Sequence, residues 1–384
     1  MRLTFANFIA LLACLLAIIA PPATAGPEGC ERGEWEPLAP MQVARQEVGA
    51  DRIANFVYVV GGLVAGFAAS NVVERYDIAL NQWSFVAPLP QPRDHMAVAA
   101  VDGLLYVVGG YQGDFNARAE MFIYDPARNR WSSGPPLPQP RGACWAVAHQ
   151  GKIYLFGGAN ILDIAQRTTY IFDPASNMWS QGPDMPTARE HLNAVSVGEF
   201  IYVIGGRVGA ALRVNERFHP PTGDWATMAQ MPTARSAMAM AGFGNKIYAA
   251  GGEIPVLHSV NEVYDIATNT WSCATPMAIP RHGIAAVTLA DRIFTPGGGI
   301  VQGLLPTTAA DSFVPEEICD AADFNCDGVV DGIDLGILLA NWSIPAGSPG
   351  CGPRPGPDGC PSDLNGDGVV DGLDLGILLA SWTI

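Results

Sequence analysis

One short pattern occurs six times in this chain of 384 residues, and it restricts the possible folds more than any other feature. In every copy a tryptophan stands 10 residues before an arginine, and a Gly-Gly pair begins 16 residues after that arginine. The pairs begin at Gly61, Gly109, Gly157, Gly205, Gly251 and Gly297. The arginines are Arg45, Arg93, Arg141, Arg189, Arg235 and Arg281. The tryptophans are Trp35, Trp83, Trp131, Trp179, Trp225 and Trp271. A fixed register of this kind indicates one supersecondary unit repeated along the chain.

The unit between Arg93 and Trp131 shows what is repeated. Its apolar runs are about five residues long and are bounded by Gly, Pro, Asn or Asp, which is typical of short strands joined by turns. Four such strands form a small antiparallel sheet with two apolar faces. A sheet of this kind is not stable alone, so the pattern predicts that the copies stack on one another.

A third element follows each glycine pair, and with it the chain resembles Kelch repeats over residues 33–315. It reads Tyr76-Asp77, Tyr124-Asp125, Phe172-Asp173, Phe218-His219 and Tyr264-Asp265, and it degrades to Phe313-Val314 in the last copy. The resemblance implies an all-β fold, a six-bladed β-propeller with one four-stranded blade per repeat. Trp35 lies on a strand that lacks partners of its own, so we expect the N-terminal strand to complete the sixth blade. Pro296 predicts that this blade is the least regular.

The first 25 residues have the pattern of a secretory signal peptide. Arg2 precedes an apolar run from Phe8 to Ala20, and Ala23-Thr-Ala25 provides a small-residue cleavage site. A lipoprotein signal that uses Cys14 is the alternative. The sequence therefore predicts export to the extracellular space, the cell surface or the periplasm, without a membrane span in the mature chain.

Acidic side chains are concentrated near the C-terminus. The chain carries a net charge of −16, and the segment from Asp311 onward has 13 acidic residues against Arg354 alone. An acidic tail and a nearly neutral body argue against a nucleic-acid partner, which requires a basic face. They favour cation binding in the tail.

Two copies of a 20-residue segment in this tail, 40 residues apart, match at 16 positions. Each copy places oxygen donors at the loop positions 1, 3, 5, 7, 9 and 12 that enclose Ca²⁺, with glycine at position 6. These residues are Asp323, Asn325, Asp327, Val329, Asp331 and Asp334 in the first loop, and Asp363, Asn365, Asp367, Val369, Asp371 and Asp374 in the second. In both copies the acid at position 12 is Asp, and one helix follows each loop. With these features the duplicated segment resembles the type I dockerin repeat. The resemblance implies a small α-helical domain at 316–384, two Ca²⁺ ions, and a cohesin-like or cell-surface protein as partner.

Two features of the propeller are candidates for a ligand site on one face. The six repeated arginines are placed equivalently and could receive carboxylates, an acidic peptide or an anionic sugar; alternatively, each bonds carbonyls of its own blade. His95 and His191 stand two positions after their arginines, beside Asp94 and Glu190, and His282 directly follows Arg281. Such groups suit acid–base or metal chemistry, but we expect histidines in separate repeats to be unrelated residues of the rim.

Cysteines add predictions about covalent structure. Cys30 and Cys319 flank the junction between the first and last strands, so we expect a disulfide there. Cys319, Cys326, Cys351 and Cys360 allow three connectivities in the exported tail. Cys144 and Cys273 fall in different blades and are not expected to pair.

These features predict a secreted protein whose propeller binds a glycan or protein ligand without catalysis. An enzyme acting on sugars is the alternative. Galactose-oxidase-like proteins are excluded, because their copper site needs tyrosines and a cross-linked cysteine beside clustered histidines. Secreted sialic acid mutarotases share the six-bladed Kelch fold and use a Glu after a glycine turn with an Arg a few residues on. Glu253 fits the first requirement, but Leu257-His258-Ser259 offers no arginine.

Overall fold

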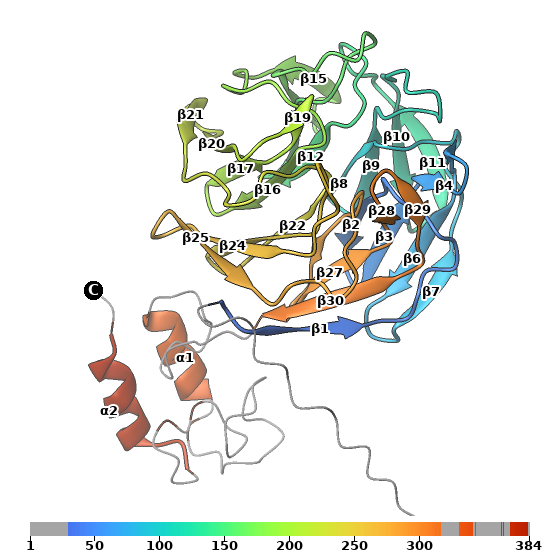
Figure 1. The fold of residues 1–384 in the computed structure, drawn as a ribbon. Helices are drawn as coiled ribbons and strands as arrows, with labels where there is room; N and C mark the ends of the chain where they lie inside the picture. Colours follow the sequence, from blue (N-terminus) through green and yellow to red (C-terminus); the bar gives the residue numbers. More distant parts are fainter. Residues whose placement is uncertain are drawn as a thin grey trace, which may run out of the picture.

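The computed structural model describes residues 30–315, 330–340, 342, 362, 364 and 369–382. Residues 30–315 form six four-stranded antiparallel sheets arranged as a ring, and this confirms the predicted six-bladed propeller (Figure 1). The predicted signal peptide at 1–25 lies outside the described residues. No described helix is long and apolar enough to cross a membrane.

Each blade takes its strands in chain order, from the ring axis outward. Blade 1 is β2 (Gly49–Ile53), β3 (Phe56–Val60), β6 (Val73–Asp77) and β7 (Gln82–Phe85). Blade 2 is β8 (Ala97–Val101), β9 (Leu104–Val108), β10 (Met121–Asp125) and β11 (Arg130–Gly134). Blade 3 is β12 (Trp145–His149), β13 (Lys152–Phe156), β14 (Thr169–Asp173) and β15 (Met178–Gln181). Blade 4 is β16 (Asn193–Val197), β17 (Phe200–Ile204), β20 (Asn215–His219) and β21 (Asp224–Thr227). Blade 5 is β22 (Ala239–Phe243), β23 (Lys246–Ala250), β24 (Asn261–Asp265) and β25 (Thr270–Ala274).

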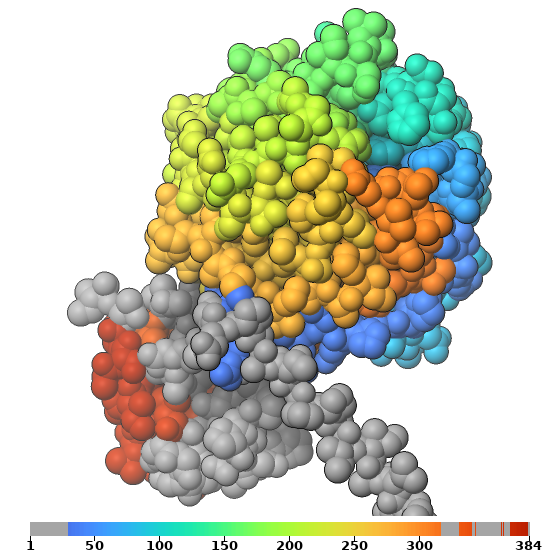
Figure 2. Space-filling model, viewed as in Figure 1, coloured from blue at the N-terminus to red at the C-terminus, as the bar shows by residue number. Residues whose placement is uncertain are grey.

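Blade 6 closes the ring with strands from both ends of the propeller. It contains β26 (Val287–Thr288), β27 (Ile293–Pro296) and β30 (Ala310–Pro315), and its outer strand is the N-terminal β1 (Gly33–Pro37). β1 pairs antiparallel with β30, which confirms the predicted closure, and Trp35 lies opposite Phe313. In Figure 2 the orange sixth blade lies beside the blue first blade. The edge of β30 is not left open, because β1 pairs with it. β26 has only two residues, and the last blade is the least regular one.

Three short hairpins extend from the loops that follow glycine pairs. They are β4 (Leu63–Val64) with β5 (Ala68–Ala69), β18 (Arg207–Val208) with β19 (Ala210–Ala211), and β28 (Gly299–Val301) with β29 (Leu304–Pro306). They belong to blades 1, 4 and 6, and β18 carries a residue of the candidate site described below.

The repeated tryptophans and glycines have the scaffold roles that the repeats predict. Every repeated indole Nε1 donates a hydrogen bond to a carbonyl of the preceding blade; for Trp35 the acceptor is Thr275 O at 2.8 Å, across the closure. Both glycines of each pair have positive φ. A Cβ on Gly110 would lie 2.6 Å from Asp94 O, so a side chain is excluded there by both backbone conformation and space.

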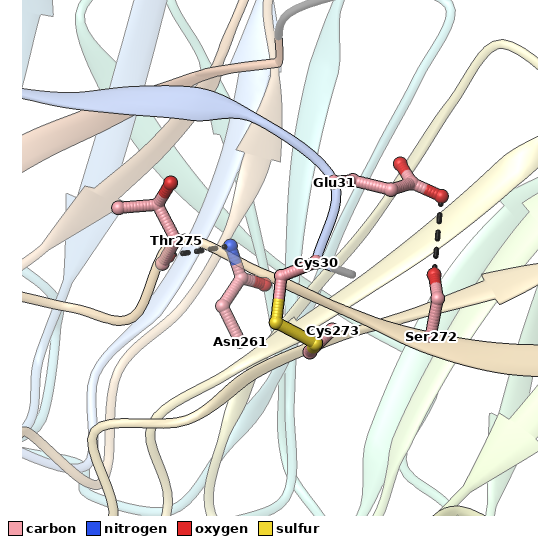
Figure 3. The surroundings of a disulfide bond; sticks show 6 residues. All are labelled: Cys30, Glu31, Asn261, Ser272, Cys273 and Thr275. Carbon is pink, nitrogen blue, oxygen red and sulfur yellow. Dashed lines mark hydrogen bonds between the residues drawn. A yellow bond between two sulfur atoms is a disulfide. The ribbon is translucent and has the colours of Figure 1, made fainter. Parts of the chain in front are cut away.

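The disulfide at the closure differs from the predicted one. Cys30 is bonded to Cys273 on β25 of blade 5 (Figure 3). The predicted partner, Cys319, lies outside the described residues, as do Cys326, Cys351 and Cys360. Glu31, next to Cys30, pairs with blade 5 as well: its N–H donates to Cys273 O, and its carboxylate accepts from Ser272 at 3.1 Å. The segment before β1 therefore crosses from blade 6 to blade 5, and this crossing places Cys30 beside Cys273.

The C-terminal segment contains two helices of nine residues, α1 (Gly332–Ala340) and α2 (Gly372–Ala380). They contact each other, and a small apolar cluster of Val330, Leu338, Val370 and Leu378 lies at their shared core. The members of this cluster occupy equivalent positions of the two sequence copies, so the duplication is repeated in the packing.

Replacing Cys30 by serine is expected to destabilise the propeller, because the disulfide joins residues separated by 243 positions. A loop of this length predicts a loss of about 2–5 kcal/mol in the free energy of unfolding, measured by denaturant titration. Cys273→Ser should have the same effect, and the double variant no larger one. Cys144→Ala, at a buried free thiol, is the control. Peptide mapping that found Cys30 linked to Cys319 would contradict this connectivity.

Candidate functional site

The six repeated arginines are framework residues in the structure. Each is 0–1% exposed, and they are among the largest fully buried side chains of the protein. Arg189 is representative: it donates to Val203 O at 2.9 Å and to Glu216 Oε2 at 2.6 Å, both within blade 4. Arg45, Arg235 and Arg281 have equivalent acidic partners in Glu74, Glu262 and Asp311. The guanidinium groups are thus bonded within their own blades and are covered from solvent. This agrees with the alternative that each arginine bonds carbonyls of its own blade, and it leaves them unable to receive a ligand.

The residues two positions after these arginines line the axis of the propeller. All six have positive φ between 50° and 59°: Glu47, His95, Ala143, His191, Ala237 and Gly283. The N–H of each donates to the C=O of the equivalent residue in the preceding blade, and Glu47 N closes the circuit by donating to Gly283 O at 2.7 Å. We call this circuit the axial ring. Its residues come from six repeats, and five of them bring a side chain to the propeller axis.

Two further repeat positions lie beside the axial ring. The residue directly after each arginine forms an antiparallel bridge with the residue directly after the glycine pair of the same blade. The bridged pairs are Gln46–Leu63, Asp94–Tyr111, Gly142–Ala159, Glu190–Arg207, Ser236–Glu253 and His282–Gly299. These two positions vary in residue type, whereas the arginine and the glycines do not. The variable positions supply the chemistry of the site.

Three histidines from blades 2, 4 and 6 meet at the axial ring. The rings of His95 and His191 are 4.9 Å apart between centroids, in an edge-to-face arrangement. His95 Nε2 lies 3.5 Å from Glu47 Oε2, and His282 Nε2 lies 3.7 Å from Glu47 Oε1. The expectation that these histidines are unrelated rim residues is therefore wrong. Equivalent positions in successive blades converge on the axis, however far apart they are in sequence.

Arg207, at the start of β18, contacts the histidine cluster through His191 and two neighbouring carboxylates. Its Nε donates to Glu190 Oε1 at 2.6 Å, its Nη1 to Glu253 Oε1 at 3.0 Å, and its Nη2 lies 3.1 Å from His191 Nε2. An arginine thus stands next to Glu253, although none follows it in sequence. Arg207 belongs to blade 4 and Glu253 to blade 5, and each directly follows the glycine pair of its own blade.

Charge within the cluster controls its protonation. Burial pushes the pKa of Glu47 up, but the positive charge of the surrounding histidines and Arg207 outweighs it, and the pKa lies below its usual value. For His95 burial acts downward, and the carboxylates of Glu47, Asp94 and Glu190 raise the pKa above its usual value. Burial opposes ionisation of Glu190 too, but His191 and Arg207 lower its pKa to about 2. Glu47 and Glu190 are therefore carboxylates at neutral pH.

An open pocket of about 630 Å³ lies over one side of the cluster. Its polar lining includes His95, Glu190, His191 and Arg207, and Tyr111 and Phe115 supply aromatic walls. Blade 3 contributes only small residues to the axial ring and to the bridged pairs. One of them, Gly142, makes room for the phenol ring of Tyr111, because a Cβ on Gly142 would lie 2.1 Å from that ring. The phenyl ring of Phe115 is 57% exposed, so the pocket combines buried charge with an accessible apolar wall.

Comparison with known proteins agrees with this architecture. The profile of the KLHDC2/KLHL20/DRC7 Kelch-repeats domain matches residues 49–252, and that of the Kelch motif matches residues 234–278. The chain belongs to the Kelch-repeat family. No curated protein matches it. A solved structure titled "Structure of YjhT" is similar at a TM-score of 0.66 and 16% identity, over 73% of this chain and 98% of that one, and it supports the fold.

Five of the predicted calcium-loop residues of this Kelch protein lie in the described part of the chain. Asp334 and Asp374, at loop position 12, are 0% exposed and accept hydrogen bonds from the N–H groups of Asp331 and Asp371 at 2.9 and 2.8 Å. Val369 is the other one. The remaining residues lie outside the described ranges: Asp323, Asn325, Asp327, Val329, Asp363, Asn365 and Asp367.

Sequence reasoning identified His95 and His191 but missed Glu47, Glu253 and Arg207 as their neighbours. A usable signal was present. Aligning the six Kelch repeats on the arginine and on the glycine pair shows three columns, the first two positions after the arginine and the one directly after the glycines, in which charged and aromatic residues replace small ones. Antiparallel pairing of these columns brings them together at the axis.

Replacing Glu216 by glutamine tests the framework role of the arginines. It leaves the guanidinium of Arg189 buried without a countercharge, so we expect a loss of about 3–5 kcal/mol in unfolding free energy. Glu120→Gln is the matched control: Glu120 pairs with Arg93 at 3.2 Å, but its side chain is 46% exposed, and we expect less than about 1 kcal/mol. Denaturant titrations with equal losses for both variants would contradict the assignment.

Proposed function

We propose that this Kelch protein is exported and binds a sugar or a sugar-like polar ligand in the pocket over the axial ring. We propose also that the C-terminal segment attaches it to a partner through a calcium-dependent, dockerin-like module. The observation that carries the first part is the pocket itself. Charged groups from three blades and two aromatic rings converge there on a volume of about 630 Å³, which suits a ligand of the size of one or two sugar rings.

The lining matches the two surfaces of a sugar ring. Hydroxyl groups need acceptors and donors in fixed positions, and the carboxylate of Glu190 and the guanidinium of Arg207 provide both. The C–H face of a sugar is apolar and packs on aromatic rings, which Tyr111 and Phe115 offer. Tyr111 remains an uncharged phenol at neutral pH, because burial raises its pKa.

Binding without turnover is the function that these charges favour. A general base works best when its pKa is near the working pH. The pKa of Glu190 is near 2, which makes its carboxylate a weak base and a stable hydrogen-bond acceptor. Its ion pair with Arg207 is 2.6 Å long, and it orients both groups toward the pocket before a ligand arrives.

A second candidate is an acid–base activity on sugars, of the epimerase or mutarotase kind. It is favoured by one arrangement: Glu190 and Glu253 share Arg207, with the histidines beside them. Burial acts to lower the pKa of His95, but Glu47, Asp94 and Glu190 raise it above its usual value, so a titratable imidazole stands next to these carboxylates. Ring opening of a reducing sugar needs a base that removes the proton of the anomeric hydroxyl and an acid that protonates the ring oxygen as its bond to C1 breaks, and ring closure reverses both transfers.

The calcium-dependent module is supported by the two helix starts. In both copies the position-9 aspartate caps its helix: Asp331 Oδ1 accepts from Ile333 N at 2.7 Å, and Asp371 Oδ1 accepts from Leu373 N at 2.8 Å. The position-12 carboxylates of Asp334 and Asp374 are fully buried. Buried carboxylates at these positions fit a hard cation held by oxygen ligands.

Phe115→Ala should weaken ligand binding about tenfold, because it removes an exposed aromatic wall of the pocket. Phe85→Ala is the matched control, since Phe85 on β7 is 56% exposed and does not line the pocket. A glycan array identifies the sugar, and calorimetry with that sugar gives the dissociation constants. Equal affinities for the two variants would contradict binding in this pocket.

The second candidate is tested with the same ligand. NMR measurement of anomer exchange on each bound reducing sugar should show no acceleration if the propeller only binds. Acceleration that is lost in Glu190→Gln and Glu253→Gln, with the dissociation constant changed by less than about tenfold, would replace binding by catalysis as the function.

Chelation by EGTA should remove the α-helical signal of the C-terminal segment and leave the β signal of the propeller unchanged, because the closely spaced acidic groups of each loop repel one another without the cation. Circular dichroism of the full chain, with and without excess Ca²⁺, measures both. A tail unaffected by EGTA, with no calcium found by mass spectrometry, would overturn the proposal for this module.

A further inference from the structure

We propose that Glu47, His95, His191 and His282 form a binding site for a divalent transition-metal ion of the zinc class, on the propeller axis beside the pocket that His95 and His191 also line. Three imidazoles and one carboxylate are the donor set that Zn²⁺ takes in tetrahedral sites, and imidazole also suits Ni²⁺, Fe²⁺ and Co²⁺. This inference goes beyond sugar binding and does not depend on it.

The distances between donor atoms allow one ion to be shared. One donor atom from each of Glu47, His95 and His191 lies within 4.8 Å of the other two, and His95 Nε2 is 3.5 Å from Glu47 Oε2. Two ligands at about 2.0–2.1 Å from a tetrahedral ion are about 3.4 Å apart. The His95–Glu47 pair already has this separation, and His282 Nε2 lies 3.7 Å from Glu47 Oε1.

All three imidazoles present Nε2 toward the axis, because their other nitrogen is held from outside. His95 Nδ1 is 2.6 Å from Asp94 Oδ1, His191 Nδ1 is 2.5 Å from Glu190 Oε2, and His282 Nδ1 is 3.1 Å from Gly299 O. An acceptor on Nδ1 places the proton there and leaves the lone pair on Nε2. Metal-binding histidines are oriented in this way by a carboxylate or a carbonyl behind them.

His282 provides an independent observation. Its side chain is 0% exposed, and among the described residues its Nε2 has no hydrogen-bond partner. The atom instead faces the carboxylates of Glu47 and Glu253, at 3.7 Å from each. A buried nitrogen without a bond is costly, and a metal ion between it and Glu47 would satisfy it.

The local charge and the backbone also favour a cation at this point. Four carboxylates surround the axis, those of Glu47, Asp94, Glu190 and Glu253, with Arg207 as the fixed positive charge among them. A Cβ on Gly283 would lie 2.5 Å from Glu47 Oε1, so glycine at that ring position makes room for the carboxylate. Metal binding requires one change: Arg207 Nη2 gives up its 3.1 Å contact with His191 Nε2, while its bonds to Glu190 and Glu253 remain.

The repeats themselves provide variants that should fold. Ala143 and Ala237 occupy the equivalent ring positions with φ of 50° and 52°, so His95→Ala and His191→Ala, at φ of 51° and 50°, place a residue that the framework already accepts. His219→Ala is the matched control, because His219 lies on β20 and bonds Thr222 at 2.9 Å outside the cluster.

The test uses the full chain, stripped of metal and kept in excess Ca²⁺ so that calcium loops do not compete. Zn²⁺ is added, free ion is removed, and the bound zinc is measured by mass spectrometry. Co²⁺ titration followed by visible absorption reports the coordination, since imidazole–carboxylate ligation lacks the strong near-ultraviolet band of thiolate ligation. We expect one ion per chain in the wild type and in His219→Ala, at least a hundredfold weaker binding in the His95→Ala/His191→Ala double variant, and a 10–100-fold weaker one in Asp94→Asn.

Two results would overturn the site. The first is a wild-type chain that retains no zinc. The second is a folded double variant that retains zinc as well as the wild type does, which would place the ion elsewhere in the chain. Cobalt spectra with thiolate bands would likewise contradict the site, because they would place the ion on cysteines. Circular dichroism and thermal melting confirm that each variant is folded. Because no sugar is used, failure here leaves the proposed ligand pocket standing, and failure of sugar binding leaves the metal site standing.

Discussion

Closure of the ring is the constraint on which the rest of this structure depends. Each blade is a four-stranded sheet with two apolar faces, and a blade can bury both only between two neighbours. Five junctions are formed by blades that follow one another in the chain. The sixth, between blades 6 and 1, depends on β1, which pairs with β30 in blade 6 and leads directly into blade 1. The Trp35 indole on Thr275 and the Cys30–Cys273 disulfide hold the N-terminal segment against blade 5. Without this closure β30 would expose an edge, and the first and last blades would each expose a face.

Closure also creates the site. The axial ring of hydrogen bonds is complete only when Glu47 N meets Gly283 O, across the same junction. Because the six residues are then held at one φ, around 50° to 59°, side chains from five different blades are directed at a common point. This convergence of side chains on the axis needs no contact between blades beyond the contacts that hold the propeller together. It is a consequence of sixfold repetition around an axis.

Conserved and variable positions within the repeat have separate tasks. The arginine of each unit is buried and bonded to its own blade, and so it cannot serve a ligand at the same time. Its two successors and the residue after the glycine pair carry little of the framework's bonding through their side chains. They can therefore differ between blades: blade 3 supplies Gly142, Ala143 and Ala159, whereas blade 4 supplies Glu190, His191 and Arg207. The asymmetry of the pocket comes from these differences, on a nearly symmetric backbone.

Much of the fold could be predicted from spacing alone, because glycine, tryptophan and arginine at fixed intervals report a repeated local geometry. The predicted closure by the N-terminal strand and the irregular sixth blade follow from where the repeats start and end. The disulfide could not be predicted in the same way. Cys30 precedes β1 and crosses to blade 5, and no pattern in the sequence reports that step of the chain. The grouping of the histidines was missed because distance along the sequence was taken as distance in space.

The sequence by itself determined the number of blades, their strands, the residues that pack between them and the duplicated acidic loops of the tail. Those are properties of local pattern, and each copy carries its own evidence. Only the tertiary structure decided which residues of different copies meet. His95, His191 and His282 come from different repeats, and successive repeats are 46 to 48 residues apart. The sequence around each histidine does not indicate which other residues it will contact. They converge because a closed ring brings equivalent positions to one axis, and closure is a property of the whole chain.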